Sequence, residues 1–197
     1  LQPVDGESAI VCDPNGSVNL YHDGNLQCYT YASGLHFADS KKADFGDSND
    51  LQIYHDGSTS YIKDTGTGNL RLCTGKGEFR NAADDETLAA FTANGAVELY
   101  YDNHKSFETM SNGIKVIGPE GSNANIALNA DDGDDNADKW MLQSLSAGGF
   151  QLSNATSGNW ETSLKAHGDG GIELYHNNSN HFETNSYGSR GFGYLSE

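Results

Sequence analysis

Four segments of this chain are variations on one short pattern, and this repetition limits the possible folds more than any other feature. Each copy reads apolar, variable, apolar, Tyr, then His or Tyr, Asp or Asn, a polar turn and a second run. The copies are VNLYHDGNLQCYTYASG from Val18, LQIYHDGSTSYIKDTGTG from Leu51, VELYYDNHKSFETMSNG from Val97 and IELYHNNSNHFETNSYG from Ile172. The repeat tyrosines and the residues seven positions after them are Tyr21, Tyr54, Tyr100 and Tyr175, then Cys28, Tyr61, Phe107 and Phe182. A repeated unit of this kind predicts a repeated structural element.

The pattern predicts a β-hairpin. Val97 and Leu99 alternate with Glu98 and Tyr100, so one face is apolar and the other carries the repeat tyrosine. The turn segments DGNL, DGST, DNHK and NNSN contain residues that tolerate positive φ. Residues expected to accept backbone amides within the turns are Asp23, Asp56, Asp102 and Asn177. One hairpin is too small to bury its apolar face, so neighbouring copies or neighbouring chains must cover it.

The composition is that of an ordered protein with a thin core. A net charge of −17 over 197 residues, with few Leu, Ile, Val and Phe, approaches the composition of disordered chains. Ten Tyr and two Trp, regularly spaced, favour order because aromatic side chains bury large areas. With 24 Gly and only three Pro, the sequence predicts an all-β fold of repeated hairpin units.

Charge and cysteine usage exclude several classes of function. Only 11 Lys and Arg residues are present and they are scattered, which argues against nucleic acid and anionic membranes as partners. No apolar run approaches the roughly 20 residues of a spanning helix, so no membrane insertion is expected. Cys12, Cys28 and Cys73 lack CxxC spacing and are expected to be free thiols. Because the chain lacks an initiating Met, we expect a fragment or a mature form.

Four consecutive segments are expected. Glu161-Thr162 precedes the fourth hairpin by the same distance as Glu86-Thr87 precedes the third, so a longer unit encloses the last copy. A period of two after Glu86 favours a strand there over a short helix capped by Asp84. The predicted segments are 1–44 with the first, divergent hairpin, 45–78 with the second, 79–117 with the third, and 118–197 with an acidic loop and the fourth.

The acidic run DDGDDNAD is a candidate calcium loop. Calcium gathers roughly six to eight oxygen ligands, and closely spaced carboxylates supply them. The order of an EF-hand is not met, because Gly133 would place Ala130 and Leu128 at ligand positions. A solvated loop is the alternative interpretation. The candidate ligands are Asp131, Asp132, Asp134 and Asp135.

Two tryptophans are the candidates for glycan binding. Trp140 and Trp160 lie in KWML and GNWET, which interrupt the repetition. An exposed indole stacks on a sugar ring while nearby Asp and Asn bond its hydroxyls; the alternative role is core packing. The sequence contains no GxSxG, P-loop or HExxH motif, and it nominates no carboxylate pair for glycan hydrolysis. No catalytic residue is therefore predicted.

Three stretches resemble recurring segments of structural tail proteins of marine bacteriophages. They are LQIYHDGSTSYIKDTGTGNLRL, GAVELYYDNHKSFETMSNGIKV and NADDGDDNADKWML. The resemblance covers most of residues 45–190, whereas the first copy departs from it after Asp23, where it reads LQCYTYASG. It implies a tail-fibre or tailspike segment that is often trimeric and adsorbs to host surface polysaccharide.

Under this resemblance the hairpins are expected to be intertwined or stacked in a homotrimeric fibre, as a β-prism or a β-solenoid-like array. The implied partners are other copies of the chain, host surface polysaccharide and other virion tail proteins, and the implied location is the extracellular virion tail. Shared contacts along a trimer axis would complete the thin cores. The alternatives are a depolymerase tailspike that hydrolyses host glycan and a monomeric carbohydrate-binding β-sandwich.

Overall fold

The computed structural model describes residues 6–193, and antiparallel strands make up most of them. The predicted all-β class is confirmed: these residues contain four antiparallel sheets and no α-helix. The chain divides into two compact units, Leu1–Cys73 and Thr74–Glu197. Within the described part of the chain there is no apolar helix of membrane-spanning length.

The first unit contains two sheets. One has the strand order β1 (Ile10–Cys12), β2 (Val18–His22), β3 (Asn25–Tyr31) and β4 (Gly34–Phe37). The other has the order β5 (Lys42–Phe45), β6 (Leu51–His55) and β7 (Ser60–Asp64). In both sheets each strand pairs with its neighbours in sequence, because short polar turns reverse the chain after every strand.

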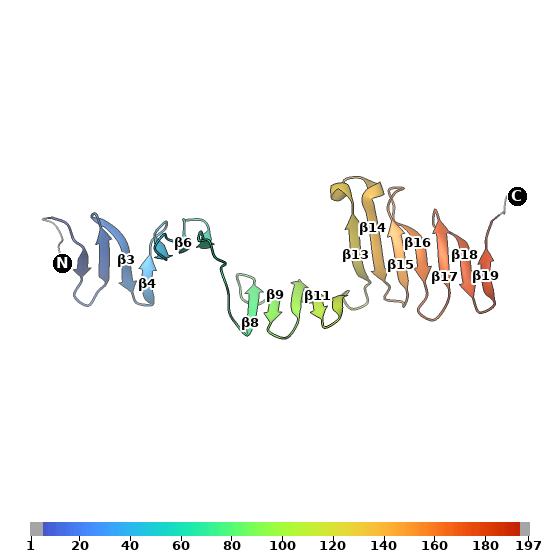
Figure 1. Ribbon diagram of the computed structural model, residues 1–197, viewed down its shortest axis with the longest axis horizontal. Coiled ribbons are helices and arrows are strands. Elements are labelled where there is room, and N and C mark those ends of the chain that lie inside the picture. The colour runs from blue at the N-terminus through green and yellow to red at the C-terminus, as the bar shows by residue number, and fades with distance from the viewer. Residues whose placement is uncertain (1–5, 194–197) are drawn as a thin grey trace. The chain divides into compact units, whose positions relative to one another are not determined.

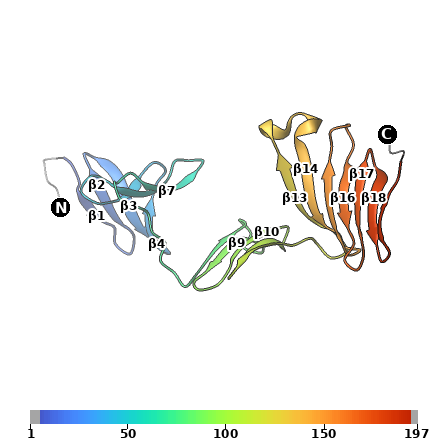
Figure 2. The same cartoon turned by 45° about the vertical axis from the view of Figure 1, so that its right-hand side comes forward.

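The second unit also contains two sheets. One is formed by β8 (Lys76–Arg80), β9 (Thr87–Thr92), β10 (Val97–Tyr101), β11 (His104–Met110) and β12 (Gly113–Val116). The other is formed by β13 (Ala124–Asn129), β14 (Lys139–Ser144), β15 (Phe150–Asn154), β16 (Glu161–Ala166), β17 (Ile172–His176), β18 (Ser179–Asn185) and β19 (Gly188–Gly191). Both are up-and-down meanders, as Figures 1 and 2 show. The strand predicted after Glu86 is β9, so the helix alternative is excluded.

The four sequence repeats form hairpins β2–β3, β6–β7, β10–β11 and β17–β18. In the first, third and fourth copies a third strand follows and begins at the repeat glycine, namely Gly34, Gly113 or Gly188. Of the predicted segment boundaries, 117/118 falls between β12 and β13. The boundaries 44/45 and 78/79 fall inside β5 and β8.

The apolar faces of these sheets are largely open. Among residues 6–193 only Cys28, Ala90, Ala155 and Ser153 are buried. The apolar residues that precede the repeat tyrosines are between 39% and 45% exposed: Leu20, Ile53, Leu99 and Leu174. The reason is that a single hairpin meander has one layer, and a sheet buries a face only when another layer packs on it. The thin core predicted from composition is therefore observed.

Candidate functional site

The repeat tyrosines lie on the polar face of their hairpins. All four are half-buried, whereas the apolar neighbour before each one is exposed. The Tyr100 hydroxyl donates a hydrogen bond of 3.0 Å to Glu98, and Tyr175 donates one to Glu173. The bond to Glu173, together with burial, raises the pKa of Tyr175 to about 12. These bonds confirm the predicted alternation, because Glu98 and Tyr100 share one face.

Charged side chains join the strands of the third repeat on this same face. Lys105 bonds both Glu98 and Glu108, and Lys115 lies 3.3 Å from Glu108. The hydrogen bonds to Glu108 and Glu98 raise the pKa of Lys105, and those from Lys105 and Tyr100 lower the pKa of Glu98. The charged groups on the polar face of this repeat thus find their partners within one chain, whereas the apolar face is left exposed.

The second hairpin has a different arrangement around its tyrosine. Tyr54 and Tyr61 are directly paired and their rings stack with centroids 4.6 Å apart. Asp56 accepts the backbone amides of Ser58 and Thr59 and the Tyr61 hydroxyl, at 2.8 to 2.9 Å. These bonds, led by that from Thr59, lower the pKa of Asp56.

Asp56 thus accepts turn amides as the sequence predicted. At the equivalent positions Asp23, Asp102 and Asn177 contribute in another way, since each adopts a positive φ between 49° and 50°. In three copies the residue therefore contributes through its positive φ, and in the second copy Asp56 contributes through the hydrogen bonds of its side chain.

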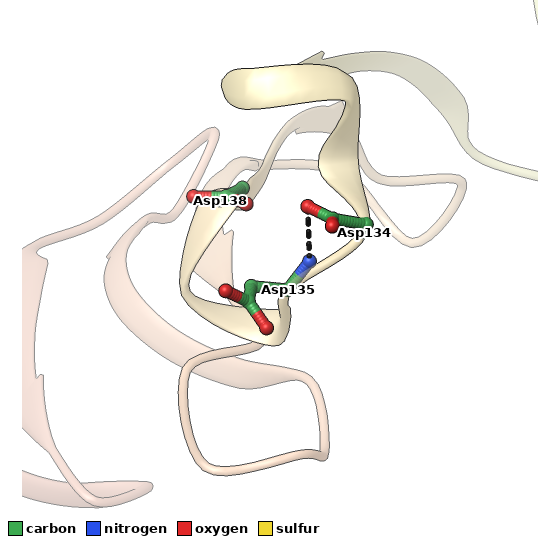
Figure 3. Close-up of side chains that lie close together, drawn as sticks. All are labelled: Asp134, Asp135 and Asp138. Atoms are coloured by element: carbon green, nitrogen blue, oxygen red, sulfur yellow. Dashed lines mark hydrogen bonds between the residues drawn. The ribbon is translucent and has the colours of Figure 1, made fainter.

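The acidic run forms two short 3₁₀ turns, η1 (Asp131–Gly133) and η2 (Asn136–Asp138), between β13 and β14. One carboxylate oxygen each from Asp134, Asp135 and Asp138 lies within 4.8 Å of the others. Figure 3 shows these three side chains and the hydrogen bond that the Asp135 amide donates to Asp134. Asp131 and Asp132 are not in this group. Asp138 was not among the four predicted ligands. Three carboxylates offer part of the roughly six to eight oxygens that calcium takes, and calcium binding stays a prediction.

Trp140 borders a surface hollow of about 430 Å³ at one end of strands β14 to β17. Trp140 is 38% exposed in the single chain, and both glycan binding and the alternative of core packing stay predictions. The hollow combines an aromatic surface with a carboxylate, amides and hydroxyls. The lining residues are Trp140, Asn154, Thr156, Ser157, Glu161, Thr162, Ser163, Tyr175, His176 and Asn177.

Cross-strand register brings the central residues of the hollow together. Trp140 pairs with Asn154, and Asn154 pairs with Glu161, so the three form a row across β14, β15 and β16. Directly paired residues project from the same face of a sheet. The Asn154 amide group donates to Ser163 at 2.9 Å and its carbonyl oxygen accepts from the Thr156 amide at 3.1 Å. Asn154 is therefore held fixed between the indole and the carboxylate.

Trp160, the second tryptophan candidate, is separate from this hollow. It directly precedes β16, is 47% exposed and is not among the lining residues. The structure therefore gives the two candidate tryptophans different surroundings: Trp140 lines this hollow among polar side chains, and Trp160 does not.

Sequence reasoning missed a repeated threonine. Nine residues after the repeat tyrosine, the side chains of Thr30, Thr109 and Thr184 accept a hydrogen bond from the first strand amide of the hairpin, at Val18, Val97 and Ile172. The distances are 2.8, 2.9 and 3.0 Å. The second copy has Lys63 at this position. Alignment of the four copies contains this signal, because Thr recurs in three of them.

Asn154 and Glu161 were also missed as members of a site. They lie 14 and 21 positions after Trp140 in the sequence, and only the strand register places them beside it. Comparison with known proteins assigns no function to these residues. No protein-family model, no curated protein and no solved structure matches this chain.

Proposed function

We propose that this chain is a structural and receptor-binding segment of a bacteriophage tail fibre or tailspike that adsorbs to host cell-surface polysaccharide. In this proposal three copies intertwine or stack as a β-prism or a β-solenoid-like fibre outside the host cell, joined to other virion tail proteins. The segment acts by adsorption rather than by chemistry. The resemblance to marine phage tail proteins supplies the starting point.

One observation carries the proposal: the apolar face of every repeat hairpin is open. Leu20, Ile53, Leu99 and Leu174 occupy the same position in their repeats and are exposed to a similar degree. A stable soluble protein keeps the apolar face of a sheet covered, and an apolar face that stays open marks an interaction site. The polar face of the third repeat already has its ion pairs within one chain. On each of the four repeat hairpins the apolar face is therefore the one assigned to other copies. The assignment does not extend to the Trp140 end of strands β14 to β16, which lies on the same sheet face as Leu174 but outside the repeat hairpin.

Solution mass tests the proposal. Light scattering on a sizing column is expected to give three times 21.1 kDa, and binding to purified host polysaccharide is expected without release of reducing ends. A monodisperse mass of one chain would contradict the fibre and favour the monomeric module, and reducing-end release would favour the depolymerase. Repeating the mass measurement with a calcium chelator tests the metal prediction for the acidic loop.

A further inference from the structure

We infer that the hollow beside Trp140 is a subsite for one neutral pyranose ring of the bound glycan. This inference rests on the proposed function and gives it a place and a sugar class. The Trp140 indole is the stacking surface and the Glu161 carboxylate is the acceptor for sugar hydroxyls, with Asn154 fixed between them.

The shape and the lining of the hollow fit a sugar ring. A volume of about 430 Å³ lies within the range of small-molecule sites. An indole that is 38% exposed offers its flat face to the apolar C–H side of a pyranose, while hydroxyl and carboxylate groups bond the rim. Both kinds of group are present here within one concave surface.

Glu161 is the second observation that points to a ligand. Its side chain is half-buried, yet none of the hydrogen bonds or ion pairs formed by residues 6–193 involves its carboxylate. By contrast, Asn154 uses both its amide nitrogen and its carbonyl oxygen within the chain. A carboxylate in this position is free to accept hydroxyl hydrogen bonds, which are stronger when the acceptor is charged.

The charges around the hollow select a neutral sugar. Glu161 is the only carboxylate in the lining, His176 is its only imidazole and neither Lys nor Arg is present, while the whole chain carries a net charge of −17. A uronic or sialic acid ring would bring a second negative charge close to Glu161, and like charges at short range repel. The hollow therefore discriminates in favour of neutral hexoses over acidic sugars.

The two tryptophans allow a direct test, since Trp160 lies outside the hollow. The variant Trp160→Phe leaves Trp140 as the only indole, and Trp140→Phe leaves Trp160. Both are titrated as intact chains with neutral hexose oligosaccharides derived from glucans, galactans and mannans, and with uronic acid oligosaccharides. A saturable change of emission is expected in Trp160→Phe with a neutral sugar, and none in Trp140→Phe. Adding Glu161→Ala to Trp160→Phe is expected to weaken binding about tenfold.

The possible results of these titrations distinguish a failure of the proposed subsite from a failure of the proposed function. A response in Trp140→Phe alone, or a stronger response to uronic acids, would overturn the subsite. So would a silent Trp140 in a chain that still adsorbs to host polysaccharide, and in that case the proposed function would stand. A chain that adsorbs to no cell surface or polysaccharide would overturn both. If Glu161→Ala leaves the affinity unchanged, the assigned role of the carboxylate is wrong.

Discussion

The second and third hairpins have the same spacing in sequence but different registers in the structure. In each, an aromatic residue lies seven positions after the repeat tyrosine. In the second hairpin, β6–β7, Tyr54 pairs directly with Tyr61. In the third, β10–β11, a bulge between Leu99 and Tyr100 shifts the register, and Phe107 pairs with Leu99 instead.

The turns explain this difference. The third hairpin reverses over the two residues Asp102 and Asn103, both with positive φ (50° and 58°), as a type I′ turn requires. The second hairpin closes at His55 and Ser60, so its loop has four residues, stabilised by the Asp56 side chain. The bulge in the third hairpin adds one residue to a strand, whereas the four-residue loop of the second hairpin has two residues more than the two-residue turn of the third.

The consequence concerns which face the aromatic residue joins. One extra residue moves Phe107 to the apolar face beside Leu99, where the first and fourth copies place Cys28 and Phe182. Two extra residues leave Tyr61 on the face of Tyr54, where the rings stack. Two residues at the same sequence spacing in different repeats therefore need not project from the same face of the sheet. Side chains alternate between faces along a strand, so one inserted residue reverses the face. On the apolar face the third and fourth hairpins thus place a phenylalanine at this position and the first places Cys28, whereas in the second hairpin the residue paired with Ile53 is Ile62.

The largest expected effect comes from placing a charge on the apolar face. If three chains assemble as proposed, Leu99→Asp is expected to convert the trimer to single chains, because three carboxylates would be desolvated at the shared interface, at a cost of several kcal/mol each. Light scattering reads the mass. Glu98→Gln, on the opposite face of the same strand, is the control and is expected to keep the mass of three chains. A trimeric Leu99→Asp variant would contradict the assignment of this face.

The same substitution in the second hairpin sharpens the comparison. Ile53→Asp is expected to weaken the proposed trimer less than Leu99→Asp, because the partner of Ile53 within its hairpin is Ile62, whereas the partner of Leu99 is Phe107. Dissociation on dilution, followed by light scattering, measures the difference. Equal weakening by both variants would mean that the register of the hairpin does not matter to assembly.

The two turn types predict that a β-branched residue destabilises the third hairpin more than the second. Asn103→Val is expected to destabilise by about 1 to 2 kcal/mol, and to lower the thermal midpoint by about 2 to 8 °C, because Val disfavours positive φ. Ser58→Val in the second hairpin is the matched control, since Ser58 is not among the residues with positive φ. Calorimetry compares the two. Equal midpoints for both variants would contradict the two-residue turn in the third hairpin.

The repeated threonine predicts a smaller effect that is absent from the second hairpin. Thr109→Val keeps the shape but leaves the Val97 amide without its 2.9 Å acceptor. The expected destabilisation is about 1 kcal/mol, or about 2 to 4 °C in the midpoint. Lys63→Ala, at the equivalent position, is expected to stay within about 0.5 kcal/mol of the parent. Midpoints in the reverse order would show that the threonine bond does not contribute to stability.

The smallest expected effect is a difference between the second and third hairpins in how stability depends on pH. Because folding lowers the pKa of Asp56, its contribution is complete above the unfolded value near 3.9 and disappears as the pH falls through the folded value. Asp56→Asn is therefore expected to lose stability relative to the parent at neutral pH, with the gap closing as the pH falls below about 4. Asp102→Asn, in a turn that depends on positive φ, is the control. A gap independent of pH would refute the cap at Asp56.

The hairpins and their two faces were predictable because they depend on residues close in sequence. Alternation of Val97, Glu98, Leu99 and Tyr100 is enough to assign faces within one strand. The hairpin turn was harder to predict, since Asp23-Gly24 forms a two-residue turn and Asp56-Gly57 opens a four-residue loop. The same dipeptide has two outcomes because its surroundings differ: Asp56 is bonded by Ser58, Thr59 and Tyr61.

The candidate site was predictable only in part. Trp140 was identified from its place outside the repetition, but nothing in the local sequence connects it with Asn154 and Glu161. Likewise, the acidic run was recognised, while the convergence of Asp138 with Asp134 and Asp135 depends on the 3₁₀ turn η2. Strand register determines which residues pair across the sheet, and turn geometry determines which carboxylates lie close together. Short-range sequence patterns encode neither.

The sequence by itself determined that this chain forms repeated antiparallel hairpins, each with a tyrosine face and an apolar face, because strand alternation and turn chemistry act over a few residues. The tertiary structure decided which aromatic residues share the apolar face and which polar groups surround Trp140. The physical reason is that one bulged residue in an antiparallel pair reverses the orientation of the residues beyond it relative to the partner strand.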